Sequence, residues 1–241
     1  GVAAHLLLQQ GHEVVGLTMQ IWDGRMPLPD AGRSGCYGPG EARDIEAARA
    51  HAGRLGIPHM VVPLTCEYRE HVLDYFRAEY LAGRTPNPCV MCNRHVKFGA
   101  LLDKAGELGA RFDFFATGHY ARVRSDPASG RRVLLKGLDG DKDQSYFLSR
   151  LTQAQLARVL FPLGEMTKTQ VRATARSLGW QDLDLRQESQ DFVECDDYAV
   201  LFRDGDARPG PIVDLKGVVR GAHRGLIHYT VGQRKGLGLG G

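Results

Sequence analysis

The stretch "ARDIEAARAHAGRLGIPHMVVPL", residues 42–64, joins a helical pattern directly to a short apolar strand. Apolar residues such as Ile45 and Leu55 recur at helical spacing, and the run at 59–64 predicts a strand. Another apolar run, "HEVVGLTM" at 12–19, precedes the helix. Long helices between short apolar strands are typical of parallel βαβ units with right-handed crossovers. The sequence therefore predicts an α/β fold built on a parallel sheet.

The alternation continues toward the middle of the chain. Helical spacing predicts one helix over 67–81 and another over 96–108, with a Pro- and Cys-rich loop between them. The run "DFFATGHY" at 113–120 predicts a further strand. In open parallel sheets, ligands bind beyond the carboxyl ends of the strands. We therefore expect three residues near strand ends to share one rim: Met19, Gly118 and His119.

The second half of the chain has a different character. Residues 121–139 alternate on both sides of an Asp-Pro-Ala-Ser-Gly turn, which predicts a hairpin. Two short helices are expected next, the second capped by Thr167, and residues 210–241 contain short β-like runs separated by glycine turns. We predict a first domain over 1–150 and a smaller α+β domain over 151–241.

Composition restricts the class of protein. The chain has 241 residues, 43% hydrophobic and 24% charged, with a net charge of +3, which permits an anionic partner without requiring one. No apolar run reaches the roughly 18 to 20 residues of a membrane span, and the N-terminus has no secretory signal pattern. Five scattered cysteines indicate free thiols rather than a disulfide framework. We expect a cytoplasmic protein without a membrane partner.

The motif "RTPNPCVMCNRHVKF", residues 84–98, contains Cys89 and Cys92 in a CxxC spacing. Pro86 and Pro88 precede the pair and restrict the backbone, and nearby cations raise the fraction of thiolate, the reactive form. Three cationic or titratable residues follow the CxxC pair within the motif: Arg94, His95 and Lys97. A zinc site is the minor alternative, because the chain has no second CxxC or HxxxH pair. The motif predicts a positioned, reactive thiol pair.

Other candidates are ambiguous when each is considered alone. His119 at a strand end could contact a phosphate or a base, but such a histidine is more often structural. The turn "DGDKDQ" at 139–144 fits a solvated charged loop, and the acidic segment around Cys195 fits a surface loop. The glycine-rich end at 229–241 lacks the spacing of a nucleotide fingerprint. For Cys36 we expect packing in the interior.

Taken together, six blocks of sequence in a fixed order are more specific than any one of them. In this order they closely resemble the family of bacterial tRNA-specific 2-thiouridylases, or tRNA-uridine 2-sulfurtransferases. The blocks are "GRTPNPCVMCNRHVKFG", "FATGHYARV", "KDQSYFLSRL", "LFPLGEMTKTQVR", "ESQDF" and "YTVGQRKGLG".

The resemblance implies a fold, a reaction and partners. The fold is a parallel-sheet, adenine-nucleotide α-hydrolase-like domain of the PP-loop ATP pyrophosphatase type, followed by a small α+β tRNA-binding domain. The reaction uses ATP and Mg²⁺ to adenylate O2 of the wobble uridine in tRNAs for Lys, Glu and Gln. A cysteine-borne persulfide, loaded by a sulfur donor protein, then delivers sulfur to C2.

The resemblance also implies roles for individual residues. Cys92 matches the first catalytic cysteine, Met19 and Gly118 match adenine-nucleotide contacts, and His119 matches a tRNA contact. Two further segments match positions that meet the target base or the tRNA: Asn87, Pro88 and Cys89 in one, and Lys142, Asp143 and Gln144 in the other. A flipped uridine requires a rigid loop of this kind beside the nucleotide.

Three departures from the family pattern affect these expectations. The pyrophosphate loop and the C-terminal β-barrel of the family are absent, so we expect a chain truncated at both ends that is inactive by itself. Val193 stands where the family has a second catalytic cysteine, and Cys195 lies two positions later. Either Cys195 replaces that cysteine or the second thiol is dispensable. Alternatively, Cys89, Cys92 and Cys195 hold an iron–sulfur cluster that carries the sulfur.

Two other functions compete with the sulfurtransferase. An ATP pyrophosphatase of the same fold, such as a ligase resembling argininosuccinate synthase, needs no cysteines. A tRNA-binding protein that has lost catalysis together with its pyrophosphate loop is the non-enzymatic alternative.

Overall fold

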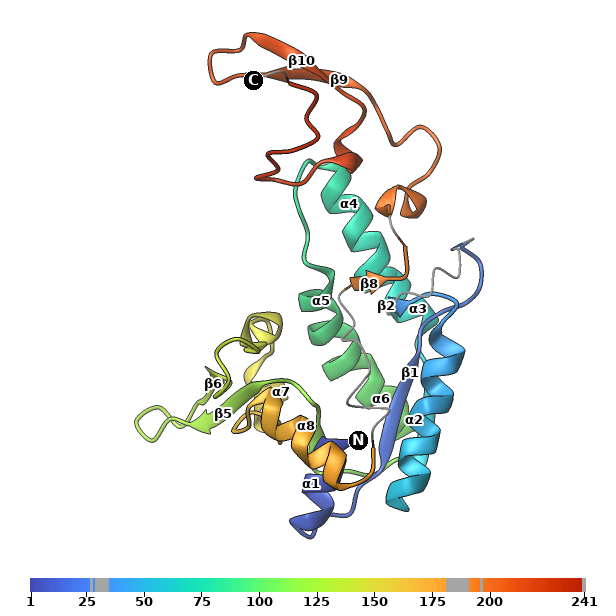
Figure 1. Ribbon diagram of the computed structural model, residues 1–241, viewed down its shortest axis with the longest axis vertical. Coiled ribbons are helices and arrows are strands. Elements are labelled where there is room, and N and C mark those ends of the chain that lie inside the picture. The colour runs from blue at the N-terminus through green and yellow to red at the C-terminus, as the bar shows by residue number, and fades with distance from the viewer. Residues whose placement is uncertain (27, 29–34, 181–190, 196, 240–241) are drawn as a thin grey trace.

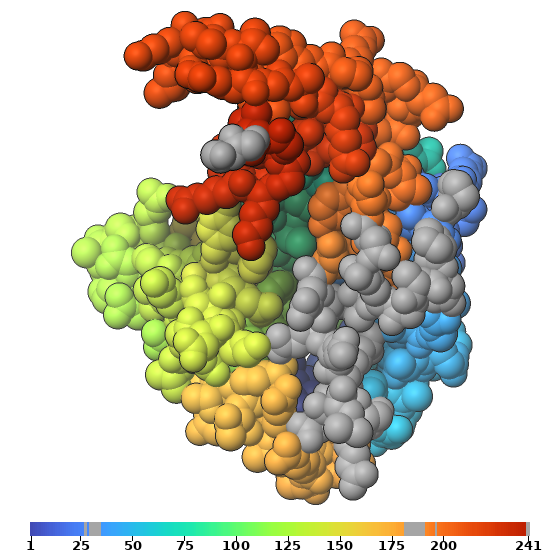
Figure 2. Space-filling model, turned by 45° about the horizontal axis from the view of Figure 1, so that its top comes forward, coloured from blue at the N-terminus to red at the C-terminus, as the bar shows by residue number. Residues whose placement is uncertain are grey.

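Figure 1 shows the computed structural model, which describes residues 1–26, 28, 35–180, 191–195 and 197–239. Two long helical rods run through the middle of the molecule, and the first parallel strands lie along one side of them. The C-terminal hairpin forms the far end of the molecule, as the ribbon and the space-filling view of Figure 2 both show.

The first βαβ unit confirms the predicted parallel topology. Strand β1 (Gly16–Gln20) pairs in parallel with β3 (His59–Pro63), and helix α2 (Glu41–Leu55) connects them. Gly56 ends α2 at φ 67°, a left-handed conformation that glycine adopts without a steric penalty. A second parallel pair joins β4 (Phe115–Ala116) to β7 (Val159–Leu160).

A third parallel pair was not predicted from the sequence. Strand β2 (Gly35–Tyr37) pairs with β8 (Asp191–Val193). A three-residue strand with two glycines close by has no periodic pattern, so only its distant partner reveals it. Of the block "ESQDF", residues 188–190 lie outside the described residues.

The first helical rod confirms the helix predicted over 67–81. It consists of α3 (Thr65–Tyr68), η1 (Arg69–Asp74) and α4 (Tyr75–Leu81) in direct succession. The middle segment η1 has π-helical hydrogen bonding, a rare local winding that is frequent at functional sites.

The second rod corrects the prediction of a Pro- and Cys-rich loop. The helix begins at Pro88, eight residues before the predicted start at 96, and comprises α5 (Pro88–Met91), η2 (Cys92–Ala100) and α6 (Leu101–Glu107). Asn87 caps it by accepting a hydrogen bond from the Val90 N–H at 3.2 Å, and Pro88 occupies the first helical position. Proline is favoured there because that N–H has no intrahelical partner. Both cysteines of the motif are therefore helical.

Shorter elements complete the chain up to Ser177, and most of them were predicted. Two of the short helices begin with a capping box, the second at the predicted Thr167 with Gln170. The remaining elements here are α1 (Val2–Gln9), β5 (Ala121–Ser125), β6 (Arg132–Lys136), η3 (Ser145–Leu148), α7 (Gln153–Ala157) and α8 (Lys168–Ser177). Strands β5 and β6 form the predicted hairpin.

The C-terminal part contains η4 (Tyr198–Leu201), β9 (Gly210–Val213), β10 (Val219–His223) and η5 (Leu226–His228). Strands β9 and β10 pair antiparallel. The predicted domain boundary near residue 150 lies just before α7 and stays a prediction. Across the parts of the chain that the structure describes, helices are too short or too polar to span a bilayer.

One contact in this fold gives a direct test of the unpredicted β2–β8 pair. A Cβ at Gly38 would lie 2.6 Å from the Glu194 carboxylate, closer than real Cβ contacts. We expect Gly38→Ala to lower the free energy of unfolding by about 1–3 kcal/mol, because the core must shift. Gly53→Ala, in the exposed interior of α2 with no atom within 4 Å, should instead raise it by about 0.5–1 kcal/mol.

Urea unfolding followed by far-UV circular dichroism measures both variants. Wild-type stability in Gly38→Ala would contradict the placement of Glu194 against this segment.

Candidate functional site

Two thiols stand on the first turns of the second helical rod. Cys89 lies in α5 and Cys92 opens η2 one turn later, and both pack half-buried against the largest core cluster. The third thiol, Cys36 of β2, is exposed, which corrects the expectation that it packs in the interior. A thiolate at Cys36 would raise the pKa of both helical thiols, and a thiolate at any of the three would raise the pKa of the buried Tyr68 hydroxyl. The three thiols are thus close enough to influence one another electrostatically.

Burial controls the acidity of these thiols. Desolvation raises the pKa of Cys92 to about 12 and also raises the pKa of Cys89. Although the Cys36 side chain reaches the surface, the surrounding protein desolvates its sulfur enough to raise that pKa as well. The Lys97 ammonium lowers the pKa of all three thiols, but desolvation is the larger effect. The resting thiols are therefore protonated at neutral pH.

Of the three cations that the sequence placed near the thiols, only one acts on them in the structure. Lys97 is the cation that acts on the thiols, whereas Arg94 turns away and its Nη1 donates to the Arg150 carbonyl at 3.3 Å. His95 stacks on His71, with ring centroids 4.9 Å apart. The physical reason is the π-helical winding of η2. Turns closed by i→i+5 hydrogen bonds bring residues five positions apart toward one face.

Cys195, the other predicted catalytic thiol, lies in a different environment. It is 6% exposed and belongs to the same core cluster, directly after β8. Among the residues that the structure describes, no group of three or more His, Cys, Asp or Glu side chains is arranged to hold a metal ion. The arrangement of Cys89, Cys92 and Cys195 therefore does not fit the iron–sulfur alternative.

The segment predicted to meet the target base has a structural role at its first residue. The Asn87 side chain is the cap of α5, and Pro88 is buried behind it. Next to Cys92, the Asn93 amide donates to the Phe147 carbonyl at 3.0 Å, while the Asn93 Oδ1 is buried without a hydrogen-bond partner in the described structure. These contacts fix the position of the helix start and of both thiols.

His119 is held as a neutral imidazole. Burial, followed by the nearby charge of Lys97, lowers its pKa to about 3. The ring lies within 2.7 Å of the Thr117 Oγ1 through Nδ1 and packs between Phe98 and Phe161, at centroid distances of 6.0 and 6.1 Å. The side chain can therefore exchange hydrogen bonds with a ligand, but it brings no positive charge to a phosphate.

The charged turn before η3 lies beside the His119 strand end. Gln144 accepts a hydrogen bond from the Tyr120 N–H at 3.0 Å through its Oε1, and its own N–H donates to the Tyr120 carbonyl at 2.9 Å. Asp143 is partly desolvated, but hydrogen bonds from Gly137 and Ser145 outweigh that effect and lower its pKa. The turn that the sequence suggested to be merely solvated is thus an ordered structure.

The two predicted nucleotide contacts differ in their exposure. Met19 is half-buried near the carboxyl end of β1. Gly118 is exposed just beyond β4, and a Cβ there would make only an ordinary 3.5 Å contact with Leu163. Packing alone therefore does not require glycine at this position. The pairs β1–β3 and β4–β7 are not hydrogen-bonded to each other in the described structure.

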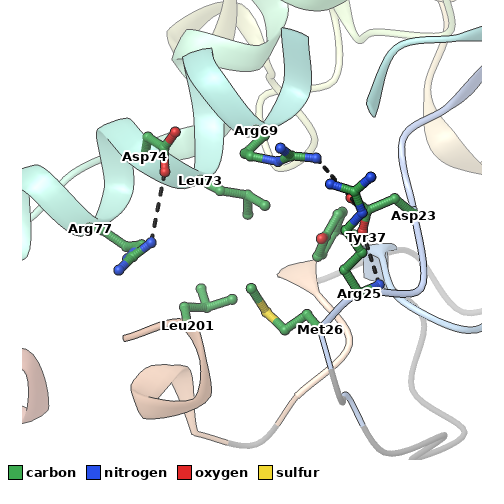
Figure 3. Close-up of a pocket in the computed structure, with 9 residues that line it drawn as sticks. All are labelled: Asp23, Arg25, Met26, Tyr37, Arg69, Leu73, Asp74, Arg77 and Leu201. Carbon is green, nitrogen blue, oxygen red and sulfur yellow. Dashed lines mark hydrogen bonds and ion pairs between the residues drawn. The ribbon is translucent and has the colours of Figure 1, made fainter. Parts of the chain in front are cut away.

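A pocket of about 370 Å³ lies apart from the predicted residues (Figure 3). Arg69 donates to Asp23 at 2.9 Å, and Arg77 lies 3.8 Å from Asp74. The Arg77 Nε is buried without a hydrogen-bond partner in the described structure. The residues that line the pocket are Asp23, Arg25, Met26, Tyr37, Arg69, Leu73, Asp74, Arg77 and Leu201. The pocket contains none of the sequence-predicted site residues. Tyr37, which lines it, is the neighbour of Cys36 in β2.

Sequence reasoning missed the grouping of Cys36 with the CxxC pair. The two lie more than fifty residues apart, and no spacing rule links them. Lys97 was among the candidate cations. That Lys97, rather than Arg94 or His95, lowers the pKa of the thiols depends on the helical winding of η2.

Comparison with known families identifies the chain over nearly its whole length. Residues 1–195 match the model described as the tRNA methyl transferase HUP domain, and residues 199–241 match the tRNA methyl transferase PRC-barrel domain. These matches confirm the predicted nucleotide-binding α/β fold class and the presence of a further domain after it.

Curated relatives agree with the resemblance seen in the sequence. Proteins named tRNA-specific 2-thiouridylase MnmA from Carboxydothermus hydrogenoformans, Endomicrobium trichonymphae and Heliobacterium modesticaldum are 48%, 47% and 46% identical to it. Each alignment covers 99% of this chain but only 65%, 65% and 61% of the respective relative. The chain thus spans less than two thirds of the length of these relatives. It belongs to the family described by the tRNA methyl transferase HUP domain and is a homologue of the tRNA-specific 2-thiouridylases.

Proposed function

We propose that the full-length protein containing this chain transfers sulfur to C2 of a uridine in tRNA in an ATP-dependent reaction. The observation that carries the proposal is the 46–48% identity, over 99% of the chain, to proteins named tRNA-specific 2-thiouridylase. The CxxC pair at the start of a capped helix, beside a single lysine, supports it with suitable chemistry. A ligase of the same fold would not need these thiols.

The proposed chemistry has two stages. Attack of the uridine O2 on ATP releases pyrophosphate and converts a poor leaving group into AMP. Sulfur carried as a persulfide on Cys92 then replaces that oxygen at C2. Lys97 would favour the Cys92 thiolate while the persulfide is loaded, because its charge opposes the desolvation of the sulfur.

Substrate binding is proposed on the remaining residues. Met19 and Gly118 would contact the adenine nucleotide, and the fixed segment from Asn87 to Cys89 would face the target base. His119, being neutral, would accept or donate a hydrogen bond to tRNA rather than pair with a phosphate. Three residues of the adjoining turn would also contact tRNA: Lys142, Asp143 and Gln144.

The proposed substrates are the wobble uridines of tRNAs for Lys, Glu and Gln. The sulfur would come from a protein that carries a persulfide, since the described chain offers thiols as acceptors of sulfur.

The first prediction concerns the catalytic thiol. Cys92→Ser in the full-length protein should reduce 2-thiouridine in tRNA by more than about a hundredfold, as expected for removal of a nucleophile. Mass spectrometry of nucleosides from digested tRNA measures the product. Cys66→Ser, which removes an exposed thiol of α3, is the matched control and should leave thiolation unchanged. Full thiolation by Cys92→Ser would reject the role of this thiol.

The second prediction concerns the pH dependence of the same thiol. Lys97→Met should raise the pKa of Cys92 further and shift the curve of its alkylation rate toward higher pH, because a charge that stabilises the thiolate is lost. Lys97→Arg should retain the wild-type curve.

Iodoacetamide labelling followed by peptide mass spectrometry reports Cys92 separately from the other thiols. Arg94→Met is the control, because that guanidinium bonds to a carbonyl away from the thiols. An unshifted curve in Lys97→Met would show that another group sets the acidity of Cys92.

A further inference from the structure

The side-chain amide of Gln155 joins α7 to the helix that carries the thiols. Its Oε1 accepts hydrogen bonds from the Thr152 N–H at 2.9 Å and from the Thr152 hydroxyl at 3.2 Å, which completes the cap of α7. Its Nε2 donates to the carbonyls of Arg94 and Phe98 in η2, each at 2.8 Å. These partners fix the orientation of the amide, because a reversed amide would place its oxygen against two carbonyl oxygens.

We propose that Gln155 is a positioning residue, which holds η2 in the winding that brings Lys97 to the face of Cys92. The two carbonyls that it binds belong to Arg94 and Phe98, and Lys97 lies between these residues in the chain. Gln155 therefore spans the turn that contains the lysine. The inference rests on the proposed function, in which Cys92 carries the sulfur.

The winding of η2 determines whether Lys97 and Cys92 share a face. Cys92 opens this π-helical segment, and Lys97 follows five residues later. Turns closed by i→i+5 hydrogen bonds bring those two positions toward one face. In a regular α-helix, five residues advance about 140° beyond a full turn, which would direct the lysine away from the thiol. Loss of the π-helical winding would therefore separate the two side chains.

A π-helical segment of nine residues needs support from outside the helix, because such winding is rare and mostly limited to a single turn. A backbone carbonyl can accept a second hydrogen bond, and a side chain that binds successive helical carbonyls competes with the regular ladder of i→i+4 bonds. Gln155 suits this role because its bonds to Thr152 already hold the amide in place. Little further side-chain entropy is lost when it binds η2.

Other contacts anchor η2 to the same part of the chain. At its start, the Asn93 amide donates to the Phe147 carbonyl of η3 at 3.0 Å. Further along, the Phe98 side chain is 2% exposed and belongs to the same core cluster as Leu156, the neighbour of Gln155. The segment η3–α7 is therefore fixed against η2 on both sides of Lys97, so the position of the Gln155 amide is set by packing as well as by its cap.

The first test measures the pH dependence of Cys92 alkylation in the full-length protein, by iodoacetamide labelling and peptide mass spectrometry. Gln155→Met lacks the donors and should lower the rate at pH 8 by at least about threefold, because Lys97 no longer favours the thiolate. Gln170→Met is the matched control, since Gln170 caps α8 through the same two bonds to Thr167, and it should retain the wild-type curve. An unchanged or faster rate in Gln155→Met would overturn the proposal.

A double-mutant cycle tests whether Gln155 acts through Lys97. In the Lys97→Met background, addition of Gln155→Met should produce no further shift of the Cys92 alkylation curve, because the charge that the winding positions is already gone. Two shifts that add would show that Gln155 acts on the thiol by another route, and the positioning role would then be rejected.

Kinetics of 2-thiouridine formation test the consequence for catalysis. Gln155→Met should lower kcat by at least about tenfold, while the KM for tRNA changes by less than about twofold. Gln155→Glu keeps the cap, because Glu is a usual capping-box residue, but it offers η2 no donor and should lose kcat to the same extent. A wild-type kcat in either variant would contradict the proposal. Failure of the proposed function would appear separately, as a wild type that makes no 2-thiouridine although its alkylation curve still depends on Gln155.

Discussion

The buried carboxylate of Glu194 holds the site region together. It accepts a hydrogen bond from the Gly40 N–H at 2.9 Å, across 154 residues of sequence. Three glycines lie so close to Glu194 that a Cβ on any of them would collide with it: Gly35, Gly38 and Gly40. A buried charge of this kind must be hydrogen-bonded to be tolerated. The contact therefore fixes β8 beside β2, and with it the position of Cys36.

A second buried carboxylate extends the same junction. Glu41, at the start of α2, accepts hydrogen bonds from the backbone N–H groups of Ile21 and Trp22 at 2.6 and 3.0 Å. Burial is the main cause of its raised pKa, while these two hydrogen bonds oppose the shift. Together, Glu41 and Glu194 connect the end of β1, the start of α2 and strand β8.

The balance between burial and charge at Cys92 determines what the site can do. Desolvation makes the resting thiol a weak acid, and Lys97 is the cation that offsets it in part. A thiol in this state is protected from indiscriminate oxidation, because the thiolate is the reactive form. Sulfur chemistry then depends on groups brought in by tertiary contacts rather than on the CxxC spacing alone.

The sequence by itself determined the parallel βαβ topology, the first helical rod, the hairpin and the cap at Thr167, because periodicity and capping are local properties of the chain. It also identified the family through ordered motifs. Only the tertiary structure decided that Cys89 and Cys92 are helical, that Lys97 lowers their pKa and that Cys36 lies within electrostatic range of them. The physical reason is that these features depend on π-helical winding and on a three-residue strand held by a distant carboxylate, neither of which leaves a pattern in neighbouring residues.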